Sequence, residues 1–383
     1  MQIRDLETFL VPPRWLFVRI GTDEGVVGWG EASLEGHGET VRAAVHAFED
    51  LLIGQDPGRI EALWQRMTKG GFYRGGPVLG SAVAGIDQAL WDIKGRALGV
   101  PVHDLLGGAV RDRVRVYGWV GGDDPTGVAE AIAAQRAAGL TAVKMNASGP
   151  LDPLGSSADT DGILARAAAA RQALGDGGDF ALDFHGRISA AYARRLLPLL
   201  EPFHPLFVEE PVAPEHGPEA LRRIVEGTSL PIATGERLYD RWDALPAVRA
   251  GIAVLQPDLA HAGGISEVRR IAALAETFDV AIAPHCPLGP LALAASLQVD
   301  FATPNVLIQE QSIGIHYNVG TNELLDYVVD PETFAFVDGY IHRPTGPGLG
   351  VTIDEGAVRR ADEIGHRWRT PVWHRRDGSL AEW

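Results

Sequence analysis

Two patterns of hydrophobic and polar positions divide the chain at about residue 112. Before that point, apolar residues alternate as in strands and then recur with helical spacing. Three strand-like runs are followed by three helical runs: 3–10, 15–22 and 26–31, then about 39–52, 58–68 and 79–98. Asp23-Glu24-Gly25 has the composition of a hairpin turn, and the last helical run stops at Gly99 and Pro101. The pattern predicts an N-terminal α+β capping domain over residues 1–112.

From about residue 113 the pattern changes to short Val/Ile/Leu-rich runs that alternate with helical stretches, which is typical of repeated βα units. Eight such runs occur, at 114–119, 142–145, 180–183, 206–209, 232–234, 253–256, 281–283 and 306–309. Eight βα units favour an α/β fold of the (β/α)8 barrel type over residues 113–320. The turn-rich residues 321–383 are expected to pack back on the capping domain.

Composition narrows the class of protein without identifying a function. The hydrophobic content of 46% is that of a globular protein, and the net charge of -16 argues against a nucleic-acid partner. Cys286 is the single cysteine, so no disulfide can form within the chain. The sequence has no apolar signal core and no apolar run long enough to span a membrane, so we expect a cytoplasmic protein with no membrane association.

Polar residues cluster where the barrel strands are expected to end, which is where the active sites of such barrels lie. In chain order they are Lys144 and Asn146, Asp183 and His185, Glu209 and Glu210, Glu236, Asp258, His285 and Glu310. Asp183, Glu209 and Glu236 are spaced by about one βα unit, so the sequence places them on three consecutive strands. Three converging carboxylates repel one another unless a cation neutralises them, and an oxygen-only ligand set favours Mg²⁺ over zinc. Three unrelated helix-capping acids are the alternative.

A second pair of residues is predicted at the ends of the next two strands. Asp258 and His285 are 27 positions apart, and an aspartate beside a histidine raises imidazole basicity and fixes its tautomer. This arrangement suits a general base, although a buried core histidine is the usual alternative. Cys286 has no such partnership and is interpreted as structural.

Acids on three successive strands, a lysine on the second strand and an opposing Asp–His pair resemble the mandelate racemase subgroup of the enolase superfamily. The similarity extends along nearly the whole chain, through residues 6–15, 71–77, 183–187, 256–259, 284–290, 309–312 and 314–318. The racemases of this subgroup carry Lys-x-Lys on the second strand, whereas this chain has Lys144-Met145-Asn146. Two-base racemisation is therefore disfavoured, and the histidines are expected to move the protons, as in acid-sugar dehydratases.

The resemblance implies one Mg²⁺ per subunit, held by Asp183, Glu209 and Glu236. It further implies that His285, supported by Asp258, removes the C2 proton of a sugar acid, and that His185 protonates the leaving 3-hydroxyl. The two roles could be exchanged. Lys144 and a protonated Glu310 would donate hydrogen bonds to the substrate carboxylate. The residues expected to contact the substrate are Arg14, Trp15, Tyr73, Asn146, Glu210 and His316.

Several other functions remain open at the level of the sequence. Within the same fold, the substrate could be another aldonate or an aldarate, or the reaction an epimerisation. A sugar-acid binding protein without activity would be expected to have lost a ligand or a histidine, and none is missing. A nicotinamide oxidoreductase is disfavoured because no Gly-x-Gly-x-x-Gly follows a strand. The resemblance also implies a symmetric homo-oligomer, with an octamer as one form.

Overall fold

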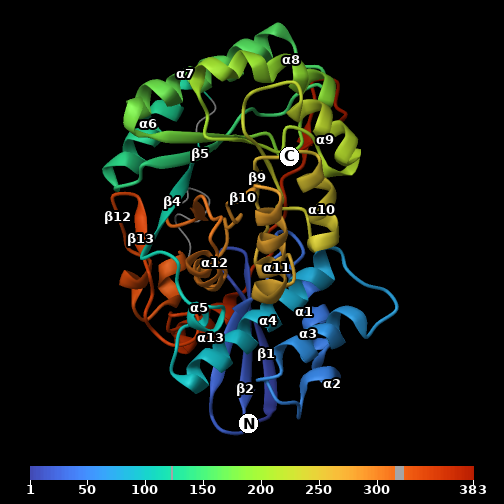
Figure 1. The fold of residues 1–383 in the computed structure, drawn as a ribbon, viewed down its shortest axis with the longest axis vertical. Coiled ribbons are helices and arrows are strands. Elements are labelled where there is room, and N and C mark those ends of the chain that lie inside the picture. Colours follow the sequence, from blue (N-terminus) through green and yellow to red (C-terminus); the bar gives the residue numbers. More distant parts are fainter. Residues whose placement is uncertain (122–123, 315–322) are drawn as a thin grey trace.

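The N-terminal part of the computed structural model is a three-stranded antiparallel sheet covered by helices (Figure 1). The structure describes residues 1–121, 124–314 and 323–383. The sheet has the order β1 (Ile3–Val11), β2 (Trp15–Thr22), β3 (Val27–Glu31). The helices of this domain are α1 (Gly38–His46), α2 (Glu49–Leu52), α3 (Ile60–Lys69), α4 (Gly76–Leu98) and α5 (Val102–Leu105). The single helix expected over 39–52 is therefore two helices, separated at Ala47 and Phe48.

Helix α4 connects the capping domain to the barrel. It begins at Gly76, before the expected start, because Pro77 lies in its first turn, where a missing backbone N–H leaves no helical hydrogen bond unmade. The buried carboxylate of Asp87 accepts hydrogen bonds from the backbone N–H of Ser266 (2.9 Å) and from its hydroxyl (2.6 Å). Ser266 lies on α11 (Gly264–Thr277), so this contact fixes α4 against a barrel helix.

Eight parallel strands form the second domain. They are β4 (Arg113–Val120), β5 (Ala142–Asn146), β6 (Asp179–Asp183), β7 (Val208–Glu209), β8 (Ile232–Thr234), β9 (Val254–Leu255), β10 (Ala281–Ile282) and β11 (Gln309–Gln311). Each strand from β4 to β10 pairs with the next, and β11 pairs with β4. A parallel bridge between Ile282 and Val306 connects β10 to the chain just before β11 and closes the ring. The predicted (β/α)8 barrel with an N-terminal α+β domain is thus confirmed.

Helices surround the barrel on its outside (Figure 1). They are α6 (Pro125–Ala137), α7 (Ser157–Leu174), α8 (Ala190–Leu200), α9 (Gly217–Val225), α10 (Arg241–Arg249), α11 and α12 (Pro290–Ala302). Short apolar strands buried on both faces are typical of parallel sheets, and the barrel strands are almost entirely buried. The buried strands of the barrel thus position the polar residues at their carboxyl ends.

The C-terminal part contacts both domains. A hairpin of β12 (Phe336–Val337) and β13 (Tyr340–His342) adds antiparallel to β4. Helix α13 (Glu355–Ile364) then lies against β1, where Asp362 accepts a hydrogen bond from the backbone N–H of Leu10 (2.7 Å). The last segment contains the two-stranded β14 (Trp373–His374) and β15 (Leu380–Ala381), and its end lies beside the barrel in Figure 1.

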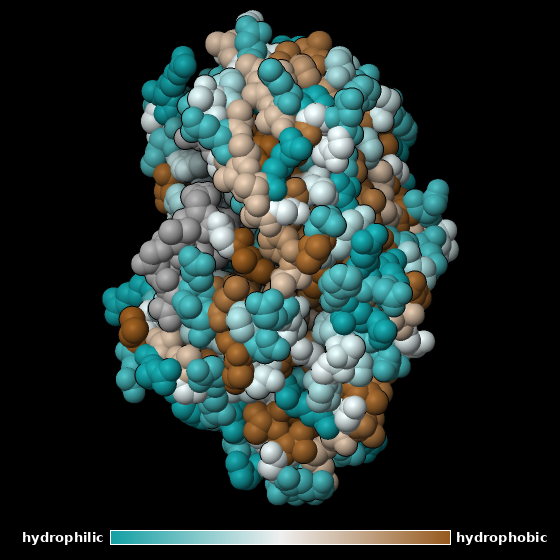
Figure 2. All heavy atoms as spheres, turned by 90° about the vertical axis from the view of Figure 1, so that its left-hand side faces the viewer, coloured by the Kyte–Doolittle hydropathy of each residue, from teal (hydrophilic) through white to brown (hydrophobic). Residues whose placement is uncertain are grey.

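Hydrophilic and hydrophobic side chains are interspersed over the face of the molecule shown in Figure 2. In the described ranges, no helix combines the length and the apolar character that crossing a bilayer requires.

Candidate active site

The carboxyl ends of β5, β6 and β7 carry three polar side chains in register. Asn146 pairs with Asp183, and Asp183 pairs with Glu209, so each residue is beside the next across neighbouring strands. Glu236 follows β8 in the loop after Thr234. The side chains of Asp183 and Glu209 are fully buried. The spacing in the sequence therefore placed acids at one end of consecutive strands, as expected for a barrel.

Lys144 lies at the centre of this acidic region. Its Nζ is 2.9 Å from Glu209 Oε1 and 3.1 Å from Glu310 Oε1, and the lysine side chain is almost completely buried. Burial lowers the pKa of Lys144, but Glu209 and Glu310 outweigh burial and raise it well above its usual value. The lysine is thus a fixed cation that connects β5 to β7 and to β11 across the barrel.

Burial and the neighbouring acids act on Glu209 more strongly than the attraction of Lys144. Burial and the charge of Asp183 raise the pKa of Glu209 well above its usual value, even with Lys144 beside it. Within the described residues, Asp183 Oδ2 and Glu236 Oε2 are buried oxygens that accept no hydrogen bond of good geometry. Ligand atoms of Asp183, His185 and Glu236 lie within 4.8 Å of one another. Buried carboxylate oxygens that lie this close together fit a hard cation.

The predicted ligand Glu209 is held differently from the other two acids. Its Oε2 accepts a hydrogen bond from Gln256 Nε2 (2.7 Å), and its Oε1 faces Lys144. Glu209 lies beside Asp183 in the sheet, so it remains a predicted ligand next to the Asp183–His185–Glu236 cluster.

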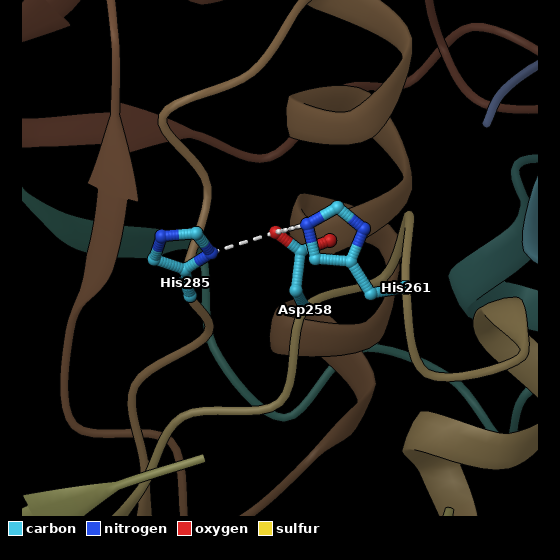
Figure 3. A group of neighbouring side chains, drawn as sticks. All are labelled: Asp258, His261 and His285. Carbon is cyan, nitrogen blue, oxygen red and sulfur yellow. Dashed lines mark hydrogen bonds and ion pairs between the residues drawn. The ribbon is translucent and has the colours of Figure 1, made fainter. Parts of the chain in front are cut away.

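His285 occupies one side of the cluster, and a carboxylate holds its ring (Figure 3). Its Nδ1 is 2.8 Å from Asp258 Oδ2, and its Nε2 is 3.3 Å from Glu236 Oε2. Burial lowers the pKa of His285, but Glu236 and the hydrogen bond to Asp258 outweigh burial and raise it to about 10. The predicted Asp–His pair is thus present, with Nε2 directed at the cluster.

A second histidine also lies against Asp258 (Figure 3). His261 Nε2 is 3.6 Å from Asp258 Oδ2 and 3.7 Å from Glu35 Oε2 of the capping domain. Ser81 of α4 lies 3.2 Å from the other ring nitrogen of His261. The aspartate that supports His285 is therefore connected to the capping domain through His261, a residue that sequence reasoning did not single out.

His185 also faces the cluster, and a guanidinium holds its ring. Its Nε2 is 2.9 Å from Asp183 Oδ2, while Arg187 Nη2 donates to its Nδ1 (2.8 Å). Arginine has no acceptor, so this contact keeps Nδ1 unprotonated and the ring proton on Nε2. Two indole rings, those of Trp119 and Trp383, stack on the imidazole. Arg187 lies in the stretch 183–187 that carries the family resemblance. Its contact with His185, however, depends on a turn geometry that the sequence does not show.

The structure brings some of the predicted substrate contacts to this region. Asn146 Oδ1 is buried without a hydrogen bond in the described part of the chain. Arg14 donates to the carbonyl oxygen of Pro287 (3.0 Å), two residues after His285. Glu210 is buried beside Asp183 and accepts a hydrogen bond from Arg237 Nε (3.1 Å). Burial and Glu236 raise the pKa of Glu210 to about 7, although Arg237 opposes this shift.

The other predicted substrate contacts lie elsewhere or outside the described residues. Trp15 is fully buried in ring contacts with Phe17 and Tyr327. The side chain of Tyr73 is 88% exposed and contacts the neighbouring ring of Phe72. His316 lies outside the described residues. As substrate contacts, these three residues remain predictions.

The fold and the site define a class of protein, and comparisons with known sequences agree with it. Residues 11–107 match the family described as "Mandelate racemase / muconate lactonizing enzyme, N-terminal domain", and residues 127–357 match "Enolase C-terminal domain-like". The chain belongs to the mandelate racemase/muconate lactonizing enzyme family of the enolase superfamily.

Two relatives that match the full chain carry the same name. Proteins named D-galactonate dehydratase from Ralstonia pickettii (strain 12J) and from Xanthomonas oryzae pv. oryzae (strain PXO99A) are 54% and 52% identical, with 100% of both chains covered. Among solved structures, a mandelate racemase/muconate lactonizing enzyme from Jannaschia sp. CCS1 is 32% identical, with a TM-score of 0.86 over 97% of this chain and 100% of its own. A member of the enolase superfamily from Salmonella Typhimurium is 28% identical, with a TM-score of 0.86 over 94% and 98%.

Proposed function

We propose that this protein is a magnesium-dependent D-galactonate dehydratase, which converts D-galactonate to 2-dehydro-3-deoxy-D-galactonate and water. The name of the full-length relatives supports the substrate. One observation carries the reaction type: the Nε2 atoms of His285 and His185 face carboxylates of the same cluster, at Glu236 and Asp183. A sugar acid bound at that cluster would have an imidazole on each side, one for each proton transfer.

The cation belongs to the proposal because the donor set fits it. Asp183 and Glu236, with Glu209 beside them, would hold Mg²⁺ through carboxylate oxygens. When bound, Mg²⁺ supplies Lewis-acid stabilisation of the negative charge that develops on the substrate carboxylate. Lys144 directs its ammonium into the same region, and it can donate a hydrogen bond where that charge develops.

His285 is the proposed base for the C2 proton, and its Nδ1–H stays directed at Asp258 throughout. Glu236 is one of the groups that raise the pKa of His285, together with Asp258 and Glu310. A cation bound by Glu236 would offset the charge of this carboxylate, which would favour the neutral imidazole that can accept the C2 proton.

His185 is the proposed acid for the departing 3-hydroxyl. Because Arg187 donates to Nδ1, the ring proton is on Nε2, the atom that faces the cluster. Transfer of this proton to the C3 oxygen, as the C3–O bond breaks, releases water and leaves an enol, and the imidazolate formed at His185 is stabilised by the Arg187 guanidinium at Nδ1. The enol then becomes the 2-keto-3-deoxy acid by taking a proton at C3. Each general acid or base step of this kind contributes about 10²–10⁴-fold.

A panel of acid sugars tests the proposal directly. The protein would be stripped of metal with a chelator, reloaded with Mg²⁺ and assayed for 2-keto acid formation with D-galactonate, other aldonates and aldarates. We expect turnover of D-galactonate, its loss after metal removal and its recovery with Mg²⁺. Turnover of another aldonate alone would reassign the substrate, and C2 inversion without keto acid would identify an epimerase instead. Light scattering would test the expected symmetric homo-oligomer.

A further inference from the structure

The last segment of the described chain lies against several side chains of the candidate active site. We call residues 366–383 the tail. It carries three tryptophans, and each ring lies against a side chain of the site: Trp368 against Arg14, Trp373 against Arg187 and Trp383 against His185. The guanidinium carbons lie 5.1 and 4.6 Å from the indole centroids, distances at which cation–π attraction operates.

Trp383 makes the most direct of these contacts. Its ring centroid is 5.9 Å from that of His185, with 7° between the planes. Trp119, at the end of β4, also stacks on the imidazole at 6.0 Å and 19°. Trp368 packs edge-on against Trp383, with 6.3 Å between the ring centroids, so a second tryptophan of the tail supports this indole.

His185 has an uncommon backbone conformation, and contacts with other residues orient its ring. It follows the end of β6 with a φ of 47°, in the left-handed region that side chains with a Cβ seldom adopt. Its Nδ1 is held by Arg187, and Arg187 is itself covered by Trp373 of the tail. The hydrogen bond at Nδ1 and the contact of Nε2 with Asp183 Oδ2 fix the direction of the ring, whereas stacking fixes its plane.

We infer that Trp383 is a positioning residue for His185, and that the tail is therefore part of the active site. The indole holds the plane of the imidazole so that the Nε2 proton is aimed at the departing hydroxyl. The inference deepens the proposed function and rests on it for the identity of the proton acceptor. The contacts with Arg187 and His185 place this role on the part of the site that contains His185.

A comparison of proton exchange with dehydration tests the role of Trp383. Trp383→Ala is expected to lower the kcat of dehydration by about 10- to 100-fold, because a small misplacement of a reacting group has effects of this size. Exchange of the C2 hydrogen in D₂O, which depends on His285, should persist. Trp383→Phe keeps a stacking ring and should recover most of the dehydration rate. Trp242→Ala, which removes an exposed tryptophan of α10, is the matched control and should match the wild type.

Chemical modification tests the contact without relying on the reaction. Diethyl pyrocarbonate acylates accessible imidazoles, and peptide mass spectrometry reports the rate at each histidine. Trp383→Ala should speed modification of His185 and leave that of His285 unchanged, while Trp242→Ala should change neither rate.

The two experiments separate the inference from the proposed function. If the wild type neither exchanges nor dehydrates D-galactonate while His185 still becomes reactive in Trp383→Ala, the substrate assignment fails and the contact stands. Equal loss of exchange and dehydration, wild-type kinetics in Trp383→Ala, or unchanged reactivity of His185 would each overturn the positioning role.

Discussion

The two histidines of the site have the same side chain and face the same cluster, but their second nitrogens have opposite partners. The Nδ1 of His285 faces the carboxylate of Asp258, which stabilises a proton on the ring. The Nδ1 of His185 accepts from the guanidinium of Arg187, which leaves that nitrogen no room for a proton. In the proposed mechanism, this difference makes one histidine the base and the other the acid.

The surroundings of the two histidines also differ: one ring lies in a polar network and the other lies among stacked rings. His285 is held from the capping domain through Asp258 and His261, in a polar network that includes Glu35 and Ser81. His185 is held by stacked indoles and by an arginine whose plane is covered by a third indole. Charge sets the role of the first histidine, whereas packing and a single hydrogen bond orient the second.

Substitution of each histidine gives the largest expected effect. His285→Asn should abolish both C2 exchange and dehydration, while His185→Asn should abolish dehydration and leave exchange in D₂O. Each loss is expected to be about 10²–10⁴-fold or more, the contribution of one general acid–base group. NMR of recovered substrate and a keto-acid assay provide the two readouts. Exchange lost with His185→Asn and retained with His285→Asn would reverse the assignment of roles.

Asp258→Asn tests the charge that distinguishes the base. Because an amide cannot support an imidazolium or enforce the same tautomer, kcat should fall by about 10²–10⁴-fold. Exchange and dehydration should decline together, since both need the base. Asp161→Asn, at an exposed position of α7, is the matched control and should leave both rates unchanged. A decline confined to dehydration would place Asp258 with the acid instead.

Arg187→Met should affect only the acid side. Without the guanidinium, Nδ1 of His185 loses its donor and the ring proton can move away from Nε2, so we expect dehydration to fall by about 10- to 100-fold. Exchange at C2 should remain near the wild-type rate. Arg223→Met, at an exposed position of α9, serves as the control. Parallel loss of both rates would show that Arg187 supports the whole site.

The smallest effect concerns stability in the metal-free protein. The pKa of His285 is raised to about 10 in the folded state, against about 6.5 for an unperturbed histidine. The bound proton therefore stabilises the fold fully below about pH 6.5, and this contribution is lost as the pH rises towards about 10. Denaturant unfolding of the wild type should show this decline, and His285→Asn should lack it. An equal decline in both proteins would assign the effect to other groups.

The strands that carry this site, and many of its residues, could be predicted from the local pattern of apolar and polar positions. Apolar runs of strand length predicted the eight barrel strands, and their spacing placed Asp183, Glu209 and Glu236 at neighbouring strand ends. The Asp258–His285 pair followed from the same periodicity. These features depend on the length of one βα unit, which is a local property of the chain.

What the sequence by itself determined is which residues reach the mouth of the barrel; the tertiary structure decided how each is held there. Contacts such as Trp383 on His185 or Glu35 beside His261 join segments that lie roughly 200 residues apart. No periodicity relates such positions, because their proximity depends on how two domains and a C-terminal segment pack. The direction in which Arg187 points depends likewise on the left-handed turn at His185. The spacing therefore predicts the metal ligands and the two histidines, and packing determines which histidine is the proposed acid.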